Sequence, residues 1–160
     1  MKYNYLFAIM SIFTLTACAH QPHQNSTMVS SQSIAQPVVV LNSTYDFATT
    51  KSKILNALKQ KNMTIFAEID HQAAASEAGL TMQPSTVIVF GTPKVGTPYM
   101  VKDPIFALQL PLKVLVTEVD GGVQVVMNRT EALVHGSRIS NDEIKDTLGK
   151  ARFLIENAIK

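Results

Sequence analysis

Two stretches of the chain place apolar residues at the spacing of one helix face. The first has a cap at Asp46 or Thr49 and a stop at Asn62, and its lysines lie largely outside the apolar face. The second follows Ser140-Asn-Asp-Glu143, which is the pattern of a capping box. The two apolar faces consist of Phe47, Ile54, Leu55 and Leu58, and of Ile144, Leu148, Ala151, Ile155 and Ala158. Both stretches predict amphipathic helices.

Shorter apolar stretches between these helices predict strands. Residues 37–41 form a β-branched run, and residues 86–90 form a compact apolar run. Residues 63–69 alternate between apolar and other residues, which predicts a strand with one buried face. That face would consist of Met63, Ile65, Ala67 and Ile69.

A hairpin completes the series of strands. Residues 112–118 and 123–127 are strand-like runs joined through Asp120-Gly121, a dipeptide that supplies the positive φ angles of a tight turn. The resulting order is strand, helix, four strands and helix. Because the helices are set apart from consecutive hairpin strands, the order predicts an α+β fold with both main helices on one face of an antiparallel sheet.

Two connecting segments predict shorter helices. Residues 72–78 favour a helix that ends at Gly79. Residues 91–111 contain four prolines, and both Thr97-Pro98 and Asp103-Pro104 combine an N-cap residue with a first-turn proline. This segment therefore predicts two short helical pieces, because Pro104 would break a single long helix.

The start of the chain has the pattern of a secretory signal. Lys2 is followed by the apolar run of residues 5–15, and small residues then lead to Cys18. As a helix this run rises only about 16 Å, which is too short for a hydrocarbon core of roughly 30 Å. We therefore interpret residues 1–17 as a signal peptide and not as a membrane span.

The exit of this signal, Leu15-Thr-Ala-Cys18, resembles the bacterial lipobox. The resemblance implies that Cys18, the only cysteine of the chain, receives a thioether-linked lipid and an acylated amino terminus, with fatty acids such as palmitate. Ala19 stands where lipoproteins of the inner membrane commonly carry Asp, which implies the periplasmic face of the outer membrane if the source has two membranes. An ordinary signal peptide with an incidental cysteine is the alternative.

The remaining chain divides into a tether and a domain. Residues 18–33 comprise the lipidated cysteine and a polar, nearly uncharged tether, and residues 34–160 form a single α+β domain. Without residues 1–17 the chain has 13 Lys and Arg against 12 Asp and Glu, a net charge of +1. This balance gives no electrostatic footprint for nucleic acid, and a lipidated Cys18 leaves no internal disulfide.

Three stretches of the domain resemble the family of domain of unknown function 302. They are residues 63–75, 89–100 and 107–116. The resemblance implies a fold like that of the TATA-binding protein, a curved antiparallel sheet backed by two helices, without any claim on DNA. It implies no established reaction and no agreed catalytic residue. The positions that match the family pattern are Asp70, His71, Gly91, Pro93, Gly96, Thr97 and Pro98, whereas Thr92 and Tyr99 depart from it.

His71 is the sharpest candidate for chemistry. Asp70 and Glu68 are carboxylates of the kind that orient a general base. On an extended strand, however, adjacent residues point to opposite faces, so Asp70 and His71 do not face each other. The pattern favours a structural histidine that bonds loop carbonyls or caps the next helix. A metal site that joins His71 to His135 lacks paired ligand spacing.

The segment from Gly91 to Thr97 imitates a phosphate-binding loop. Its glycines have the right separation after a strand, but Gly96 directly precedes Thr97 where the motif requires Lys, and Pro93 removes an N–H. Nucleotide binding by this motif is therefore rejected. A helix start at Thr97-Pro98 beside Lys94 is still suited to a small anion.

Together these features favour a non-catalytic binding module of the cell envelope, with a small molecule or an envelope protein as its partner and no cofactor. The candidate ligand site is a groove formed by Asp70, His71, Lys94, Gly96 and Thr97, since the loops after the second and third strands are expected at one end of the sheet. Two alternatives stay open. One is a hydrolytic or metal-dependent enzyme that uses His71. The other is a structural or homodimeric envelope component whose sheet edge or open face is covered by another subunit.

Overall fold

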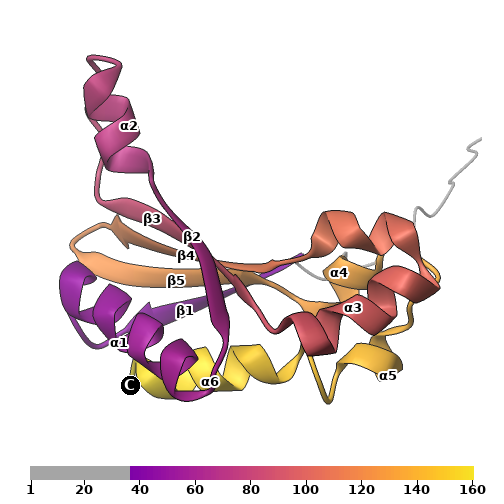
Figure 1. Ribbon diagram of the computed structural model, residues 1–160. Coiled ribbons are helices and arrows are strands. Elements are labelled where there is room, and N and C mark those ends of the chain that lie inside the picture. Colours follow the sequence, from indigo (N-terminus) through magenta and orange to yellow (C-terminus); the bar gives the residue numbers. More distant parts are fainter. Residues whose placement is uncertain (1–36) are drawn as a thin grey trace, which may run out of the picture. The chain divides into compact units, whose positions relative to one another are not determined.

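Figure 1 shows the computed structural model, which describes residues 37–160. Its centre is a five-stranded sheet in which every neighbouring pair is antiparallel and the strand order is β1-β5-β4-β3-β2. The strands are β1 (Val38–Ser43), β2 (Thr64–Asp70), β3 (Ser85–Gly91), β4 (Leu112–Val119) and β5 (Gly122–Asn128). The predicted α+β class is confirmed.

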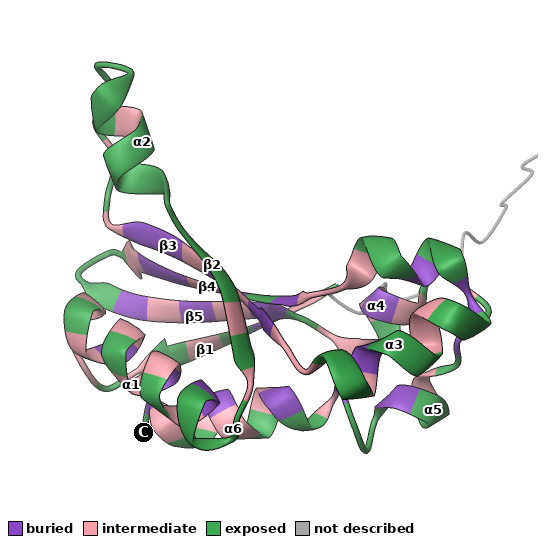
Figure 2. Ribbon diagram, in the orientation of Figure 1, coloured by how far each residue is buried: buried purple, intermediate pink, exposed green. Residues whose placement is uncertain are grey.

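Two helices cover one face of this sheet. α1 (Phe47–Gln60) and α6 (Lys150–Ala158) contact each other and lie on the same side of the strands (Figure 1). Asp46 caps α1 as predicted, because its carboxylate accepts the backbone N–H of Thr49 at 2.8 Å. The centre of the core, where the buried segments of Figure 2 meet, consists of Ile54, Leu58, Ile88, Phe90, Val114, Val116, Val125 and Ile155. Each such side chain contributes about 1.5–3 kcal/mol by leaving water.

The predicted hairpin is confirmed. β4 and β5 pair from Val114 opposite Met127 to Val119 opposite Gly122. Asp120 has a φ of 50° and Gly121 a φ of 79°, which are the positive angles that a two-residue turn between right-twisted strands requires.

Strand β2 departs from the predicted pattern at Phe66. Ile65 and Ala67 lie opposite adjacent residues of β3, so that Phe66 is the extra residue of a β-bulge. Because side chains alternate along a strand, the bulge moves Ala67 and Ile69 to the face opposite Ile65. The prediction of a single buried face through Met63, Ile65, Ala67 and Ile69 is therefore wrong, and Ile69 is 44% exposed.

The predicted C-terminal helix consists of two helices with a turn between them. α5 (Asn141–Ile144) begins at the predicted capping box, where the Glu143 carboxylate accepts the backbone N–H of Ser140 at 2.9 Å. α6 begins only at Lys150. The buried face is kept across the break by Ile144, Leu148, Ala151 and Ile155. The sequence thus predicts the face correctly and misses the break.

The segment between β3 and β4 forms two helical pieces, as predicted. They are α3 (Pro93–Lys102) and the 3-10 helix η1 (Pro104–Gln109), which Asp103 caps. The predicted helix start at Thr97-Pro98 is wrong, because α3 begins at Pro93 and Pro98 lies inside it. Pro93 already takes the first helical position, where a missing N–H has no cost.

A further helix, α2 (His71–Glu77), stands between β2 and β3 and confirms the helix predicted over residues 72–78. Gly79, with a φ of 75°, follows its end. None of its residues is buried. Figure 1 shows α2 raised on the side of the sheet away from α1 and α6. We call residues 67–86, which include α2 and the flanking strand ends, the arm.

The expected signal peptide, lipidated Cys18 and tether lie outside the described residues. The start of the domain at residue 34 lies outside them as well. Within residues 37–160 no helix has the length and apolar character that a membrane span requires.

Candidate functional site

The structure does not bring the two halves of the predicted groove together. In the antiparallel pair of β2 and β3, Asp70 lies opposite Thr86 and Thr64 lies opposite Gly91. The loop after β2 and the loop after β3 are therefore at opposite ends of the sheet. The expectation that they share an end is wrong, because it fits parallel neighbours and not antiparallel ones.

Asp70 and His71 lie at the base of α2. The Asp70 carboxylate accepts the backbone N–H of Ala73 at 2.9 Å and so caps the helix, which is the role that the sequence suggested for His71. His71 itself is exposed in the first turn. Within the described part of the chain, no group of three His, Cys, Asp or Glu side chains is placed to hold a metal ion.

Lys94, Gly96 and Thr97 belong to the first half of α3. Lys94 and Thr97 are exposed, whereas Gly96 is buried. An added Cβ on Gly96 would lie 3.1 Å from the Leu110 side chain, so the glycine allows close packing between α3 and the segment before β4. It lines a small, mainly apolar hollow of about 60 Å³ together with Phe66 and Met100. This place favours a packing role for Gly96.

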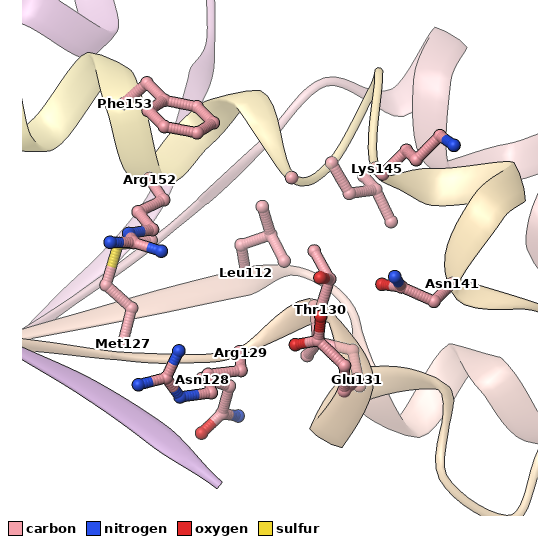
Figure 3. Close-up of a pocket in the computed structure, with 13 residues that line it drawn as sticks. Leu112, Met127, Asn128, Arg129, Thr130, Glu131, Asn141, Lys145, Arg152 and Phe153 are labelled. Carbon is pink, nitrogen blue, oxygen red and sulfur yellow. The ribbon is translucent and has the colours of Figure 1, made fainter. Parts of the chain in front are cut away.

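A different site, rich in polar groups, lies where β5 ends. A pocket of about 230 Å³ opens between the end of β5, α4 (Thr130–Val134), α5 and the start of α6 (Figure 3). We call it the arginine pocket. Its polar side chains are those of Asn128, Arg129, Thr130, Glu131, Asn141, Lys145 and Arg152, and its apolar wall includes Leu112, Met127, Leu133 and Leu148.

Two arginines give the pocket its name. Arg129 directly follows β5, and its Nε donates to the carbonyl of Val38 at 3.2 Å, which ties this side chain to the edge strand β1. Arg152 comes from the first turn of α6. Figure 3 shows the two guanidinium groups on one side of the pocket, with Asn141 and Lys145 on the other.

Two polar atoms of the pocket are buried without a partner. Among the described residues, Arg152 Nε and Asn141 Oδ1 are fully buried atoms that make no hydrogen bond. A buried polar group without a partner costs about 1–3 kcal/mol, so native proteins rarely keep one. Both atoms belong to side chains that line the pocket, so a small rearrangement of either side chain would let a bound molecule complete its hydrogen bonds.

The charge of the pocket is positive. Arg129, Lys145 and Arg152 outnumber Glu131. Lys145 is partly engaged, because its ammonium group donates to Asp142 at 2.8 Å, and this contact raises the pKa of Lys145. The two guanidinium groups are thus the main cations that face the pocket, and guanidinium forks bind carboxylates and phosphates in a bidentate manner.

The break between α5 and α6 shapes this pocket. Asn141, Lys145, Gly149 and Arg152 all line it. An added Cβ on Gly149 would lie 2.6 Å from the carbonyl oxygen of Lys145, so only glycine permits this turn without a backbone shift. Lys145, Leu148 and Gly149 of the break line the pocket, so the break is a part of the site.

A polar tie from α3 holds α5 in place. Tyr99 donates its hydroxyl hydrogen to the Glu143 carbonyl at 2.8 Å, and the Glu143 carboxylate pairs with the Lys102 ammonium group. The hydrogen bond from Lys102, supported by those from Ser140, lowers the pKa of Glu143 to about 2. The helix that carries Asn141 is thus fixed by groups outside the pocket.

The comparisons with known proteins identify the domain. Residues 39–160 match the model of the family described as "Domain of unknown function DUF302". The chain belongs to this family. It is similar in structure to an uncharacterised DUF302 protein from Bacillus stearothermophilus, with a TM-score of 0.71 over 79% of this chain and 100% of that one, at 16% identity. At that identity the likeness shows the DUF302 fold alone.

Two curated relatives are named as ion channels. The chain is 35% identical over 88 residues to proteins named fluoride-specific ion channel FluC 1 from Brucella suis biovar 1 (strain 1330) and from Brucella abortus biovar 1 (strain 9-941). These matches cover 55% of this chain. The chain spans only 34% and 32% of the length of those relatives.

Sequence reasoning did not single out the arginine pocket of this DUF302 domain. Its residues come from β4, β5, α4, α5, the turn after α5 and α6, and no short motif joins them. One signal was present: Arg152 follows Ala151, which lies on the predicted apolar face of the last helix. The aliphatic part of an arginine beside such a face can lie along the apolar surface while its guanidinium group reaches a polar pocket. Arg129, placed just after the hairpin, gave no signal of its own.

Proposed function

We propose that this protein is a lipid-anchored component of the cell envelope whose DUF302 domain faces the periplasm and binds a ligand without chemical turnover. The lipobox-like Leu15-Thr-Ala-Cys18 supports the anchor, and Ala19 supports the outer membrane. Residues 18–33 act as the tether between membrane and domain. A triply acylated cysteine holds a protein at a bilayer far longer than one chain does, since each buried methylene contributes about 0.8 kcal/mol.

The ligand that fits the arginine pocket is a small organic anion. The observation that carries this proposal is the buried, unpartnered Nε of Arg152 beside the guanidinium of Arg129. A carboxylate or phosphate group between the two guanidinium groups pairs with both, and a small turn of the Arg152 side chain lets it satisfy that donor as well. A hydroxyl or amine on the same molecule satisfies the unused acceptor Asn141 Oδ1.

The pocket favours binding over catalysis. No histidine, serine or cysteine is among the described side chains that line it, and of the other acid, base or nucleophile types there, Thr130, Glu131 and Lys145, the lysine is engaged by Asp142 at 2.8 Å. Its volume of about 230 Å³ is at the small end for ligand sites, which limits the ligand to a few heavy atoms. Glu131 at its rim disfavours molecules with several negative charges.

Thermal-shift titration tests the ligand. We expect lactate, a small hydroxy acid with a single carboxylate, or inorganic phosphate to raise the Tm of the wild type by several degrees, since a ligand that binds only the folded state stabilises it. Arg152→Gln should lose that rise, and Lys150→Gln should keep it, because Lys150 is an exposed cation of the same helix that does not line the pocket. Sodium fluoride is a further arm, in view of the named activity of the curated relatives.

An equal response of Arg152→Gln and the wild type would contradict the pocket as the site. A measured turnover that His71→Ala abolishes at unchanged Tm would instead favour the enzyme alternative. A rise of the Tm with fluoride alone would mean that the ligand is a halide and not an organic anion.

Mass spectrometry of the membrane fraction tests the anchor. The native protein should begin at Cys18 and carry acyl groups, and Cys18→Ser should abolish both the lipid and the cleavage before residue 18. An uncleaved or lipid-free native chain, or an unchanged product from Cys18→Ser, would contradict the proposed anchor.

A further inference from the structure

The face of the sheet opposite α1 and α6 carries an apolar row that crosses all five strands. The register places Ile69 opposite Val87, Val87 opposite Leu115, Leu115 opposite Val126, and Val126 opposite Val40. We call these five side chains the apolar row. Val40 is 51% exposed and Ile69 is 44% exposed, and the three central residues are only half-buried by their neighbours.

The residue types of this row are those of a covered sheet. An antiparallel sheet with one solvated face alternates between apolar and polar residues. In β5, however, buried Val125 is followed by Val126, and in β4 Leu115 stands between buried Val114 and Val116. At the level of the row, aliphatic residues therefore occupy both faces, as in a sheet packed on both sides, whereas the neighbouring positions on the outer face are the polar residues Lys113, Thr117, Gln124 and Asn128. Within residues 37–160, no helix provides that second layer.

Polar side chains border the apolar row. Lys113 lies beside it on β4, and Asn42 pairs with Gln124 on the two strands at the other edge. No charged residue belongs to the row itself. An apolar centre with a polar border is the anatomy of a protein interface.

The arm points to the same side as this row. α2 has seven residues, none of them buried, and an isolated helix of that length is marginal in water. Leu80, just after α2, is 67% exposed. Figure 1 shows α2 raised above the face that α1 and α6 leave free. The base of the arm is held by the pairing of β2 and β3 and by the buried residues Ser85 and Thr86, whereas α2 and Leu80 at its tip bury little against their own domain and are placed to contact a molecule on that face.

We infer that a second copy of this chain covers the apolar row, so that two protomers form a dimer with facing sheets. Leu115 lies on β4, the central strand of five, and is the middle residue of the row. A two-fold axis between the facing sheets that passes over Leu115 sets it against its own copy. Each of the other four residues of the row then lies opposite a Val or Ile of the partner's row. The apolar row is therefore self-complementary, as an isologous interface requires.

The size of the face shows what the arms must contribute to a dimer. Five strands at the usual spacing, each six to eight residues long, give a face of roughly 500 Å². A stable interface takes about 800 Å² from each partner. The face alone is too small, and contact of each arm with the other protomer supplies the difference. The domain is also nearly neutral, so two copies repel each other little.

Light scattering after size exclusion tests the dimer, with the full chain carrying Cys18→Ser so that no lipid directs association. We expect the mass of two chains at micromolar concentration. Leu115→Lys should give single chains and raise the dissociation constant by roughly a hundredfold or more, since the buried charge enters the interface twice. Val101→Lys, the same change at a 76% exposed position of α3, should remain a dimer.

Val40→Lys serves as a second disrupting variant, because its site on the edge strand β1 is exposed and tolerates lysine in the folded monomer. Circular dichroism must show the same fold in all variants that are compared. A wild type of single chains at these concentrations would overturn the inference. So would a dimer that survives both Leu115→Lys and Val40→Lys. Single chains that bind lipid vesicles through Leu115 would assign the row to a membrane instead.

Discussion

The arginine pocket and the apolar row lie in one small domain and depart from an ordinary protein surface in opposite ways. In the pocket, Arg152 Nε and Asn141 Oδ1 are buried without hydrogen-bond partners. In the row, Val40 and Ile69 are exposed without an apolar cover. Both departures cost free energy in the isolated chain. Each therefore points to the kind of molecule that removes the cost, a small anion for the pocket and an apolar protein surface for the row.

The two regions also differ in what supports them. The pocket is framed by helices that are fixed through specific contacts, such as the bond from Tyr99 to the Glu143 carbonyl at 2.8 Å. The arm carries α2, whose residues are all at least partly exposed. A rigid frame suits a pocket that must select a ligand. A projecting arm suits an interface in which the arm becomes buried only when a partner binds. Substitutions in the two regions should separate these properties.

The largest effect is expected at the turn that shapes the pocket. Gly149 has helical φ and ψ angles, so helix propensity alone predicts that Gly149→Ala stabilises the protein by about 1 kcal/mol. The added Cβ, however, would lie 2.6 Å from a backbone oxygen, and the overlap should reverse the sign. We expect a net loss of about 1–3 kcal/mol in the free energy of unfolding and a weaker thermal response to anions. Urea denaturation and the thermal-shift titration measure the two effects.

Gly122→Ala is the matched control. At that position an added Cβ would lie 3.8 Å from the nearest backbone oxygen, an ordinary contact, and the change should stay within about 0.5 kcal/mol. The dimer should be unaffected by Gly149→Ala, since the turn lies outside the apolar row. A stabilised Gly149→Ala protein, or one that loses the dimer but keeps its anion response, would contradict the separation of the two regions.

The sequence predicts the frame of the fold because that frame depends on local patterns. The Asp120-Gly121 turn, the Asp46 cap and the apolar face from Ile144 to Ile155 follow from spacing and capping chemistry, and the structure confirms them. The bulge at Phe66 has no such signal, because an extra residue in a strand is defined by its partner strand. The reversal of the apolar pattern of β2 was therefore beyond the reach of a single sequence.

The candidate site was harder to predict for a related reason. Asp70 and Lys94 stood out as charges near turns, but their distance depends on which strands are neighbours. Arg129 and Arg152 come from segments separated by the whole α4–α5 region, and they meet in one pocket that the turn at Gly149 also lines. Pairing between distant segments is set by the packed sheet and helices. The sequence therefore indicated which side chains are chemically reactive, but not which of them lie together in the folded domain.

The smallest effect is expected from pH, and it again distinguishes the pocket end from the arm. The pKa of Glu143 falls from 4.5 to about 2 on folding, chiefly through the hydrogen bond from Lys102. A carboxyl group with a lowered pKa stabilises the folded state above its unfolded value, and this stability disappears as the pH falls from about 4.5 through 2. Glu143→Gln should therefore lower the Tm slightly at pH 7 and flatten the decline of Tm below pH 5.

Glu77→Gln is the control, because it removes the same charge from exposed α2. Its plot of Tm against pH should run parallel to that of the wild type. Equal flattening in both variants would mean that the bond between Lys102 and Glu143 does not hold α5 in solution, and the rigid frame assigned to the pocket would then lose its main electrostatic support.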